Sequence, residues 1–400
     1  MRILYLSQLI PYPADAGPKV RIYHVLQYLA EAGHAVTLVA FQRQDDSPAH
    51  IGHVRQYCQA VHTVLMRRSR LKDMWYLGTS LLRQRPFLIE RDTVADMHAL
   101  IRTLVTQQAF DAVHADQLWM AQYALTAKKA APHLKTVLDQ HNAVYLVPQR
   151  LSHDSGNPLL RFILRQESRH MARFEVEMCQ RFDQVVWVTA EDKTAVAQAA
   201  GAAAHKITGS VIPICVDPNA KPVVNRAENA HRVTFLGGLH WPPNAAGIVW
   251  FAREVWPHIV REVPAARLTV IGKDPPAELS QPGLVNVEVT GYVADVMPYL
   301  RETAVFIVPL HAGGGMRVKI VDGWSWGLPI VSTTIGAEGI AYTHGHDILI
   351  ADNAEGFAQA TLQLLQQPQK AHQLALAGRQ TLESHYDWHK IYPQWAEIYT

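Results

Sequence analysis

The stretch that decides the fold runs from residue 305 to residue 332 and reads VFIVPLHAGGGMRVKIVDGWSWGLPIVS. It opens with an apolar, β-branched run, Val305–Pro309, which predicts a buried strand. Three consecutive glycines follow, then a helical pattern over Arg317–Trp326, and a second strand is predicted at Ile330–Ser332. A strand, a helix and a strand in this order are typical of one βαβ unit of a parallel sheet.

The same alternation of strands and helices extends outward from this stretch to both ends of the chain. In the second half we predict strands at Val233–Leu236, Arg267–Ile271 and Val285–Thr290, with a helix over Asn244–Glu262. In the first half we predict strands at Ile3–Leu6, Ala35–Phe41, Ala60–Leu65, Ala112–Ala115, Thr136–Asp139 and Gln184–Thr189, with amphipathic helices such as Val20–Ala32 between them. This alternation favours parallel sheets covered by helices on their faces.

The length and the position of one loop predict two domains. A chain of 400 residues exceeds what one hydrophobic core usually supports. The alternation stops at a loop rich in Pro, Asn and Ala, Val216–Asn229, and restarts after it. We therefore predict an α/β protein with two doubly wound Rossmann-like domains, 1–215 and 216–384, facing a cleft. An aromatic-rich helix in 385–400 is predicted to pack back on the first domain.

Composition and charge exclude several classes of protein. With 48% hydrophobic and 18% charged residues the chain is a normal folded protein, and its formal net charge of +2 gives no field that would favour nucleic acid. The three cysteines, Cys58, Cys179 and Cys215, are widely spaced and fit neither a disulfide framework nor a zinc site.

The sequence shows neither a secretion signal nor a membrane span. The N-terminus, Met1–Leu6, runs straight into a β-like apolar stretch and lacks the features of a signal peptide. No stretch reaches the roughly 18 to 20 apolar residues that a span requires. We expect a cytoplasmic protein, which is soluble or at most peripheral at the inner face of the plasma membrane.

The three glycines of the first stretch and the helix after them predict an anion site. Glycines let backbone N–H groups approach a ligand closely, and a helix N-terminus carries a partial positive charge. Arg317 and Lys319, in the first helical turn, would add two positive charges against a diphosphate. Asp322, one turn further on, could accept the hydroxyls of a ribose. The alternative is a glycine-rich turn with solvated charges.

Four segments carry a resemblance to a known family: PLHAGGGMRVKIVDGWSWGLPIVSTTIGAEGI at 309–340, FLGGLHWPPNAAGIVWFAREVWP at 235–257, TGYVADVMPYL at 290–300 and the opening residues 1–41. They resemble family 4 of the retaining glycosyltransferases, whose fold is called GT-B. The likeness is closest to bacterial members that build polysaccharides, lipopolysaccharides or glycolipids. It extends over almost the whole chain and is weakest in residues 66–110.

The resemblance implies donor-binding roles in the second domain. Asp322 corresponds to the carboxylate, normally Glu, that binds the ribose of the donor. Many members have another Glu eight positions earlier, where this chain has Gly314, and a subset with GGGTRLK-like sequence lacks it as well. The other donor-binding residues implied are Gly238 and His240 after the first strand of the domain, Tyr292 and Val293 at the base, and the glycines Gly313, Gly314 and Gly315.

The loop after the first strand of the chain, residues 13–19, often contains two glycines in the family, which give room for donor phosphate and acceptor. Here Gly17, implied to bind the donor, is followed by Pro18, which removes one backbone N–H. Lys19 is predicted to contact the acceptor. For Lys19 and Arg21 the alternative is an exposed helix start.

Two further strand ends in the first domain supply candidate residues. The segment Asp139-Gln140-His141-Asn142 resembles the family motif whose His faces the donor sugar and the acceptor, so His141 is predicted to orient substrates rather than to attack. Asp116 and Gln117, with His114 beside them, are predicted acceptor contacts at the preceding strand end. A role in capping the loop is the alternative for these residues.

We expect no metal ion and no cofactor. The chain has no two aspartates separated by one residue, the usual metal-binding device of the other main glycosyltransferase fold. Arg317, Lys319 and helix N-termini would then balance the charge of the leaving diphosphate, which is a form of electrostatic catalysis. In the retaining mechanism that the resemblance implies, the leaving phosphate accepts the proton of the acceptor.

The expected partners are a nucleotide sugar and a glycan or lipid-linked acceptor. Residues 66–85, MRRSRLKDMWYLGTSLLRQR, mix six Arg or Lys with an apolar patch, which suits peripheral contact with an anionic membrane. A solvated connecting helix is the alternative for this segment.

Two other functions remain open at this point. One is another enzyme of the same fold, a sugar phosphorylase or a nucleotide-sugar epimerase, although neither a pyridoxal phosphate lysine nor paired carboxylates are indicated. The other is a non-catalytic subunit that binds a nucleotide sugar. A nicotinamide dehydrogenase is disfavoured because no GxGxxG follows the first strand.

Overall fold

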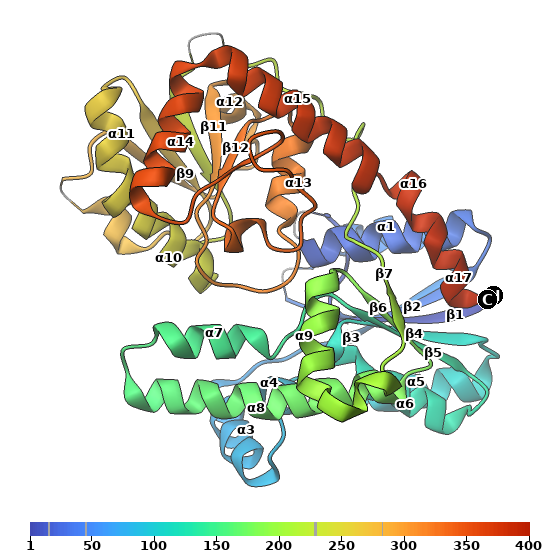
Figure 1. The fold of residues 1–400 in the computed structure, drawn as a ribbon. Helices are drawn as coiled ribbons and strands as arrows, with labels where there is room; N and C mark the ends of the chain where they lie inside the picture. The colour runs from blue at the N-terminus through green and yellow to red at the C-terminus, as the bar shows by residue number, and fades with distance from the viewer. Residues whose placement is uncertain (15–16, 45, 228–229, 282) are drawn as a thin grey trace. The chain divides into compact units, whose positions relative to one another are not determined.

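The computed structural model describes residues 1–400 except 15–16, 45, 228–229 and 282, and describes the backbone alone at 70–72, 81 and 154. The chain divides into two compact units. Unit 1 comprises Met1–Cys215 together with Ile391–Thr400, and unit 2 comprises Val216–Lys390. Each unit is built on one sheet with helices on its faces (Figure 1).

The sheet of unit 1 has the strand order β3-β2-β1-β4-β5-β6-β7, and every neighbouring pair is parallel. Its strands are β1 (Arg2–Ser7), β2 (Ala35–Gln42), β3 (Ala60–Leu65), β4 (Ala112–Asp116), β5 (Lys135–Gln140), β6 (Gln184–Trp187) and β7 (Gly209–Val211). The central strands β1, β4 and β5 are buried almost throughout, as continuous apolar runs in a covered parallel sheet must be.

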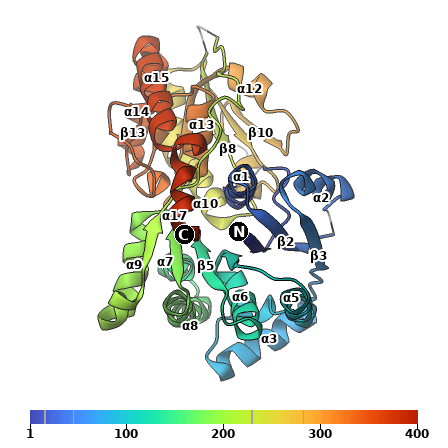
Figure 2. The same ribbon diagram turned by 90° about the vertical axis from the view of Figure 1, so that its right-hand side faces the viewer.

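Helices cover both faces of this sheet (Figures 1 and 2). The helices of this unit up to residue 200 are α1 (Gly17–Glu31), α2 (Pro48–Val54), α3 (Arg70–Arg83), α4 (Phe87–Arg91), α5 (Ala95–Gln107), α6 (Leu118–Ala130), α7 (Leu146–Asp154), α8 (Pro158–Arg181) and α9 (Ala190–Ala200). One face is packed by α5, α6 and α8, and the other by α1 and the C-terminal segment with α17 (Trp395–Tyr399). His34 contacts both ends of the chain, since its ring lies 3.1 Å from the Met1 amine and 5.6 Å from the Tyr399 ring.

The sheet of unit 2 has the order β10-β9-β8-β11-β12-β13, again with parallel neighbours. Its strands are β8 (Arg232–Leu236), β9 (Arg267–Ile271), β10 (Val287–Gly291), β11 (Thr303–Val308), β12 (Ile330–Ser332) and β13 (Leu349–Ile350). The order reverses direction between β8 and β11, as it does between β1 and β4 in unit 1. In open α/β sheets ligands bind outside the carboxyl ends of the strands at such a switch point.

The helices of unit 2 are α10 (Pro242–Trp250), α11 (Trp256–Glu262), α12 (Met297–Arg301), α13 (Val318–Ser325), α14 (Ala354–Gln366), α15 (Pro368–His385) and α16 (Trp388–Ile391), the last ending at the start of the C-terminal segment of unit 1. The single helix predicted over 244–262 is wrong in detail. A π-helical turn over Phe251–Val255 separates α10 from α11. Pro257 explains the break, because it lacks the N–H that a continuous α-helix requires at that position.

Two parallel-sheet α/β units of this kind confirm the predicted fold class. The prediction overlooked the edge strands β7 and β13, which are three and two residues long and therefore carry little periodicity. No helix in the described part of the chain is long and apolar enough to cross a membrane.

Candidate active site

Two glycine loops lie at the switch point of the sheet in unit 2. The loop of Gly237 and Gly238 follows β8, and the loop of Gly313, Gly314 and Gly315 follows β11, the neighbouring strand. Gly313 and Gly315 have φ of +130° and +73°, which only glycine adopts without strain. The glycine run therefore depends on glycine for its backbone conformation, as the anion-site prediction for this strand end expects, and Gly313 and Gly315 are themselves buried.

Lys319 connects the two loops. Its Nζ lies 2.8 Å from Oδ1 of Asn244, and Nδ2 of Asn244 donates to the carbonyl oxygen of Gly238 at 2.8 Å. The ammonium packs closely against Gly237, because a Cβ atom added to this glycine would lie only 2.9 Å from Nζ. Burial, and then the charge of Arg317, lowers the pKa of Lys319 to about 7. This lysine is therefore a cation held at low pKa directly beneath the first glycine loop.

Arg317 is buried, so the alternative of a solvated charge is wrong for this residue. It is the N-cap residue of α13, and the helix begins at Val318. The guanidinium donates to the carbonyl oxygens of Gly314 and Gly315 at 2.6 and 2.9 Å and to that of Ile335 at 3.2 Å. These hydrogen bonds fix the conformation of the glycine run, and they hold the positive charge of the guanidinium near the loop.

The carboxylate of Asp322 is paired with Lys221, whose ammonium also lies 4.7 Å from the centre of the Trp326 ring. Lys221 stands in the loop before β8, and the sequence analysis gave it no role. His240 is exposed at the end of the first glycine loop. Tyr292 and Val293 follow β10, the edge strand beyond β9, and the Tyr292 side chain is 76% exposed.

In unit 1 the carboxyl ends of β4 and β5 bring His141 and Asp116 together. Nε2 of His141 lies 2.9 Å from Oδ1 of Asp116, and both side chains are buried. The Asp116 carboxylate accepts this hydrogen bond, so Nε2 carries the proton and the tautomer is fixed. Gln117, with φ of +68°, turns the chain from β4 into α6.

Asp139 lies beside this pair and is held by Arg21. The alternative of an exposed helix start is wrong for Arg21, because this residue is fully buried and its Nη2 atom lies 2.7 Å from Oδ1 of Asp139. Burial alone would raise the pKa of Asp139, but the charge of Arg21 holds it below its usual range. A sequence signal existed, because Arg21 precedes Val25 and Leu29 at four-residue spacing on the apolar face of α1.

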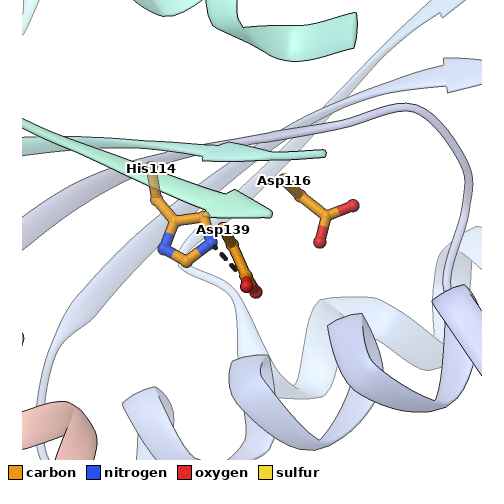
Figure 3. Close-up of side chains that lie close together, drawn as sticks. All are labelled: His114, Asp116 and Asp139. Atoms are coloured by element: carbon orange, nitrogen blue, oxygen red, sulfur yellow. Dashed lines mark ion pairs between the residues drawn. The ribbon is translucent and has the colours of Figure 1, made fainter. Parts of the chain in front are cut away.

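His114, Asp116 and Asp139 form a compact cluster in which each residue offers one ligand atom within 4.8 Å of the others (Figure 3). Nε2 of His114 lies 3.8 Å from Oδ2 of Asp139. The donor set is typical of a metal site, but the guanidinium of Arg21 already neutralises the carboxylate of Asp139. A dication in the cluster would therefore be repelled by the buried positive charge of Arg21. The residues therefore fit a metal ion poorly, and metal independence stays a prediction.

Glu175 supports the loop that carries His141, and the sequence analysis did not identify it. This buried carboxylate on α8 accepts from the backbone N–H of Val144 and Tyr145 at 2.9 and 3.2 Å and from the side chain of Gln140. Burial raises its pKa to about 8. No feature of the sequence singles out Glu175, because its partners lie about 30 residues away.

Several polar atoms at these strand ends have no hydrogen-bond partner among the described residues. They are Oδ2 of Asp116, Nε2 of Gln117, Oε1 of Gln140 and Nδ1 of His141. Buried polar atoms are usually paired, so such a group at one sheet edge indicates a place where a polar ligand completes the bonding.

Gly17 is the first residue of α1 and Lys19 lies in its first turn, whereas Asp15 and Ala16 of the predicted loop lie outside the described residues.

Comparison with known proteins places this geometry in context. A family model described as "Glycosyltransferase Family 4" matches residues 16–220, and one described as "Glycosyl transferases group 1" matches residues 230–367. A Klebsiella pneumoniae protein described as an uncharacterized 44.6 kDa protein in the cps region is 20% identical over 98% of both chains. The 2-deoxystreptamine N-acetyl-D-glucosaminyltransferase of Niallia circulans is 24% identical over 42% of this chain and 44% of that protein.

Among solved structures, HepE from Anabaena in complex with UDP and glucose is similar with a TM-score of 0.70. The match covers 100% of this chain and 99% of that chain at 16% identity. At this identity the likeness shows the fold, which is that of the GT-B glycosyltransferases.

Proposed function

Because the chain belongs to glycosyltransferase family 4, we propose that it transfers a sugar from a nucleoside-diphosphate sugar to a glycan or lipid-linked acceptor. We propose further that the transfer retains the anomeric configuration and needs no metal ion. The observation that carries the donor assignment is the pair of glycine loops at the switch point of unit 2, joined by Lys319 and Asn244. A diphosphate is the ligand that such backbone and such a cation suit.

In this proposal Lys319 contacts the leaving diphosphate and Arg317 supports it. The ammonium of Lys319 lies beneath the Gly237 loop, and an anion there would compensate its burial and its repulsion by Arg317. Most donors of Arg317 are used by the carbonyls of Gly314, Gly315 and Ile335. Arg317 therefore acts on the diphosphate through its charge and through the shape of the glycine run.

On the same grounds we propose that Gly238, His240, Gly313, Gly314, Gly315 and Asp322 bind the donor. Asp322 is paired with Lys221, so binding of the ribose requires that Lys221 shares or releases the carboxylate of Asp322. We propose that Tyr292 and Val293, which follow the edge strand β10, hold the base.

For the acceptor we propose the strand ends of unit 1. His141, oriented by Asp116, would fix the reacting hydroxyl, and Asp116, Gln117 and Lys19 would contact the rest of the acceptor. The leaving phosphate would take the proton of that hydroxyl, so the chain itself supplies no nucleophile. The unpartnered atoms of Asp116, Gln117 and His141 support this assignment, because an acceptor with several hydroxyls would satisfy them.

Purified protein and a panel of UDP-, GDP- and ADP-sugars test the proposal in two steps. A binding donor raises the melting temperature by mass action, and that donor is then offered with candidate acceptors. Proton NMR of the product reads the anomeric configuration. Transfer with inversion contradicts the retaining mechanism, and donor binding with neither hydrolysis nor transfer favours a non-catalytic binding subunit.

Peripheral contact with an anionic membrane is proposed for residues 66–85. Within this segment Met74 and Trp75 on α3 are 74% and 61% exposed. Apolar side chains of this size on a basic helix are typical of a helix that lies on a lipid surface.

A further inference from the structure

Unit 1 contains a basic groove that none of the assignments above uses. It has a volume of about 1060 Å³ and lies between the end of α3, α5, α6 and α8. Six Arg or Lys side chains line it against one carboxylate, Glu177, and the cations are Arg83, Arg85, Arg102, Lys129, Arg173 and Arg181.

Half of these cations have no ion-pair partner among the residues that the structure describes. Arg83 and Arg85 pair with Glu90, and Arg181 pairs with Glu177. Among the described residues, Arg102, Lys129 and Arg173 form no ion pair, although they come from three different helices. Three exposed positive charges that converge on one groove favour an anionic ligand.

The groove is separate from the candidate active site. Gln117 precedes α6 at the carboxyl edge of the sheet, whereas Lys129 lies near the other end of that helix. The 13 residues of α6 span about 20 Å. The groove cations therefore do not belong to the acceptor site proposed at the strand ends.

One face of α8 joins the groove to an exposed apolar surface. Positions 159, 162, 166, 169 and 173 are spaced alternately by three and four residues, so they share one side of the helix. Leu159 and Phe162 on this face are 68% and 56% exposed, and Arg169 and Arg173 follow them toward the groove. On α3, Leu82 is 86% exposed and directly precedes the groove residue Arg83.

From this arrangement we infer that the groove binds the phosphate head group of an anionic phospholipid while the α8 face lies on the membrane. A soluble polyanion would account for the cations but not for Leu159, Phe162 and Leu82, which gain from contact with acyl chains. Leu125, Phe174 and Met178 also line the groove, and these apolar side chains suit the glycerol end of a lipid.

This inference extends the membrane contact proposed for residues 66–85 and rests on that proposal only for α3. Its readout is vesicle binding, which requires no transfer reaction. A failure here would thus be distinguishable from a failure of the glycosyltransferase assignment.

The test is co-sedimentation of the full chain at low salt with vesicles of phosphatidylcholine alone or with added phosphatidylglycerol. The groove variant is R102Q/K129Q/R173Q. The matched control is R253Q/R261Q/R267Q, which removes three exposed charges from unit 2. We expect the groove variant to lose about tenfold or more of its partitioning onto the anionic vesicles, and the control to bind as the unmodified chain does.

Two further variants distinguish the ligand. L159S/F162S should also weaken binding to anionic vesicles, and R102K/R173K, which keeps the charge, should retain it. Equal binding of the groove variant and the control overturns the inference. It is also overturned if L159S/F162S binds as the unmodified chain does while millimolar inorganic phosphate displaces the vesicles, because the groove would then hold a soluble anion. Melting temperatures confirm that each variant is folded.

Discussion

The hydroxyl of Tyr399, the penultimate residue, lies 2.6 Å from Nδ1 of His114 on β4. Both side chains are fully or almost fully buried, and Nε2 of His114 faces Asp139 at 3.8 Å. The C-terminal helix α17 thus contacts the group of titratable residues at the strand ends of unit 1. The end of the chain therefore takes part in the support of the candidate acceptor site.

Tyr399→Phe should lower the free energy of unfolding by about 1–3 kcal/mol, because Nδ1 of His114 would lose its partner in a buried place. Chemical denaturation of the variant measures this change. Tyr292→Phe is the control, since that exposed side chain should tolerate the same change with little effect. Equal stabilities of the two variants would show that the buried hydrogen bond contributes nothing.

Arg317→Met should destabilise unit 2 even without a donor. The substitution leaves the carbonyls of Gly314, Gly315 and Ile335 without their buried donor, at a cost of roughly 1–3 kcal/mol. Arg301→Met, at an exposed arginine of the same unit, is the control, and thermal unfolding without ligand compares them.

Lys319 should make donor binding depend on pH. Below pH about 7 the ammonium is already protonated, so affinity is constant. Above that pH, binding of the diphosphate must protonate Lys319, because the anion raises its pKa in the complex. Affinity then falls by up to about tenfold per pH unit. Calorimetry in buffers of different ionisation enthalpy measures the proton uptake.

Two variants separate this effect from titration elsewhere. Lys319→Arg keeps its charge over the range and should flatten the pH profile. Lys319→Met should lower kcat by about 10²–10³, since it removes a contact to the leaving group. Its stability should change little, because removal of a desolvated cation offsets loss of the hydrogen bond to Asn244. A normal rate for Lys319→Met would remove the diphosphate assignment.

His141→Gln should lower kcat by roughly 10²-fold through misplacement of the acceptor, with a near-normal melting temperature. Asp116→Asn should have a similar effect, because the amide no longer fixes the tautomer of His141. Steady-state kinetics on the two single variants and the double variant provide the check. Fully additive losses would mean that the two residues act independently.

Transfer should proceed in excess EDTA at the rate seen without it. The physical reason is that Arg317 and Lys319 supply positive charge beside the glycine loops. Loss of activity in EDTA that Mg²⁺ or Mn²⁺ restores would contradict the prediction, and would direct attention to His114, Asp116 and Asp139.

Much of the fold could be predicted because its signals are local. Buried parallel strands such as Arg267–Ile271 and Ile330–Ser332 appear as short apolar runs, and their predicted bounds are the observed ones. The glycine run before α13 can likewise be recognised in the sequence, because only glycine lets the backbone approach a ligand closely. The short edge strands β7 and β13 were not predicted, since two or three residues carry no period.

The sequence by itself determined the two parallel sheets, the glycine loops at their carboxyl ends and the family, because each depends on residues adjacent in the chain. Only the tertiary structure decided how the charges are used. Arg21 and Asp139 are 118 residues apart in sequence, and Lys319 and Asn244 are 75 apart. A cation can be solvated, paired with a buried carboxylate or held at a low pKa, depending on its desolvation and on the neighbours that folding brings to it. The local sequence pattern predicts neither of these.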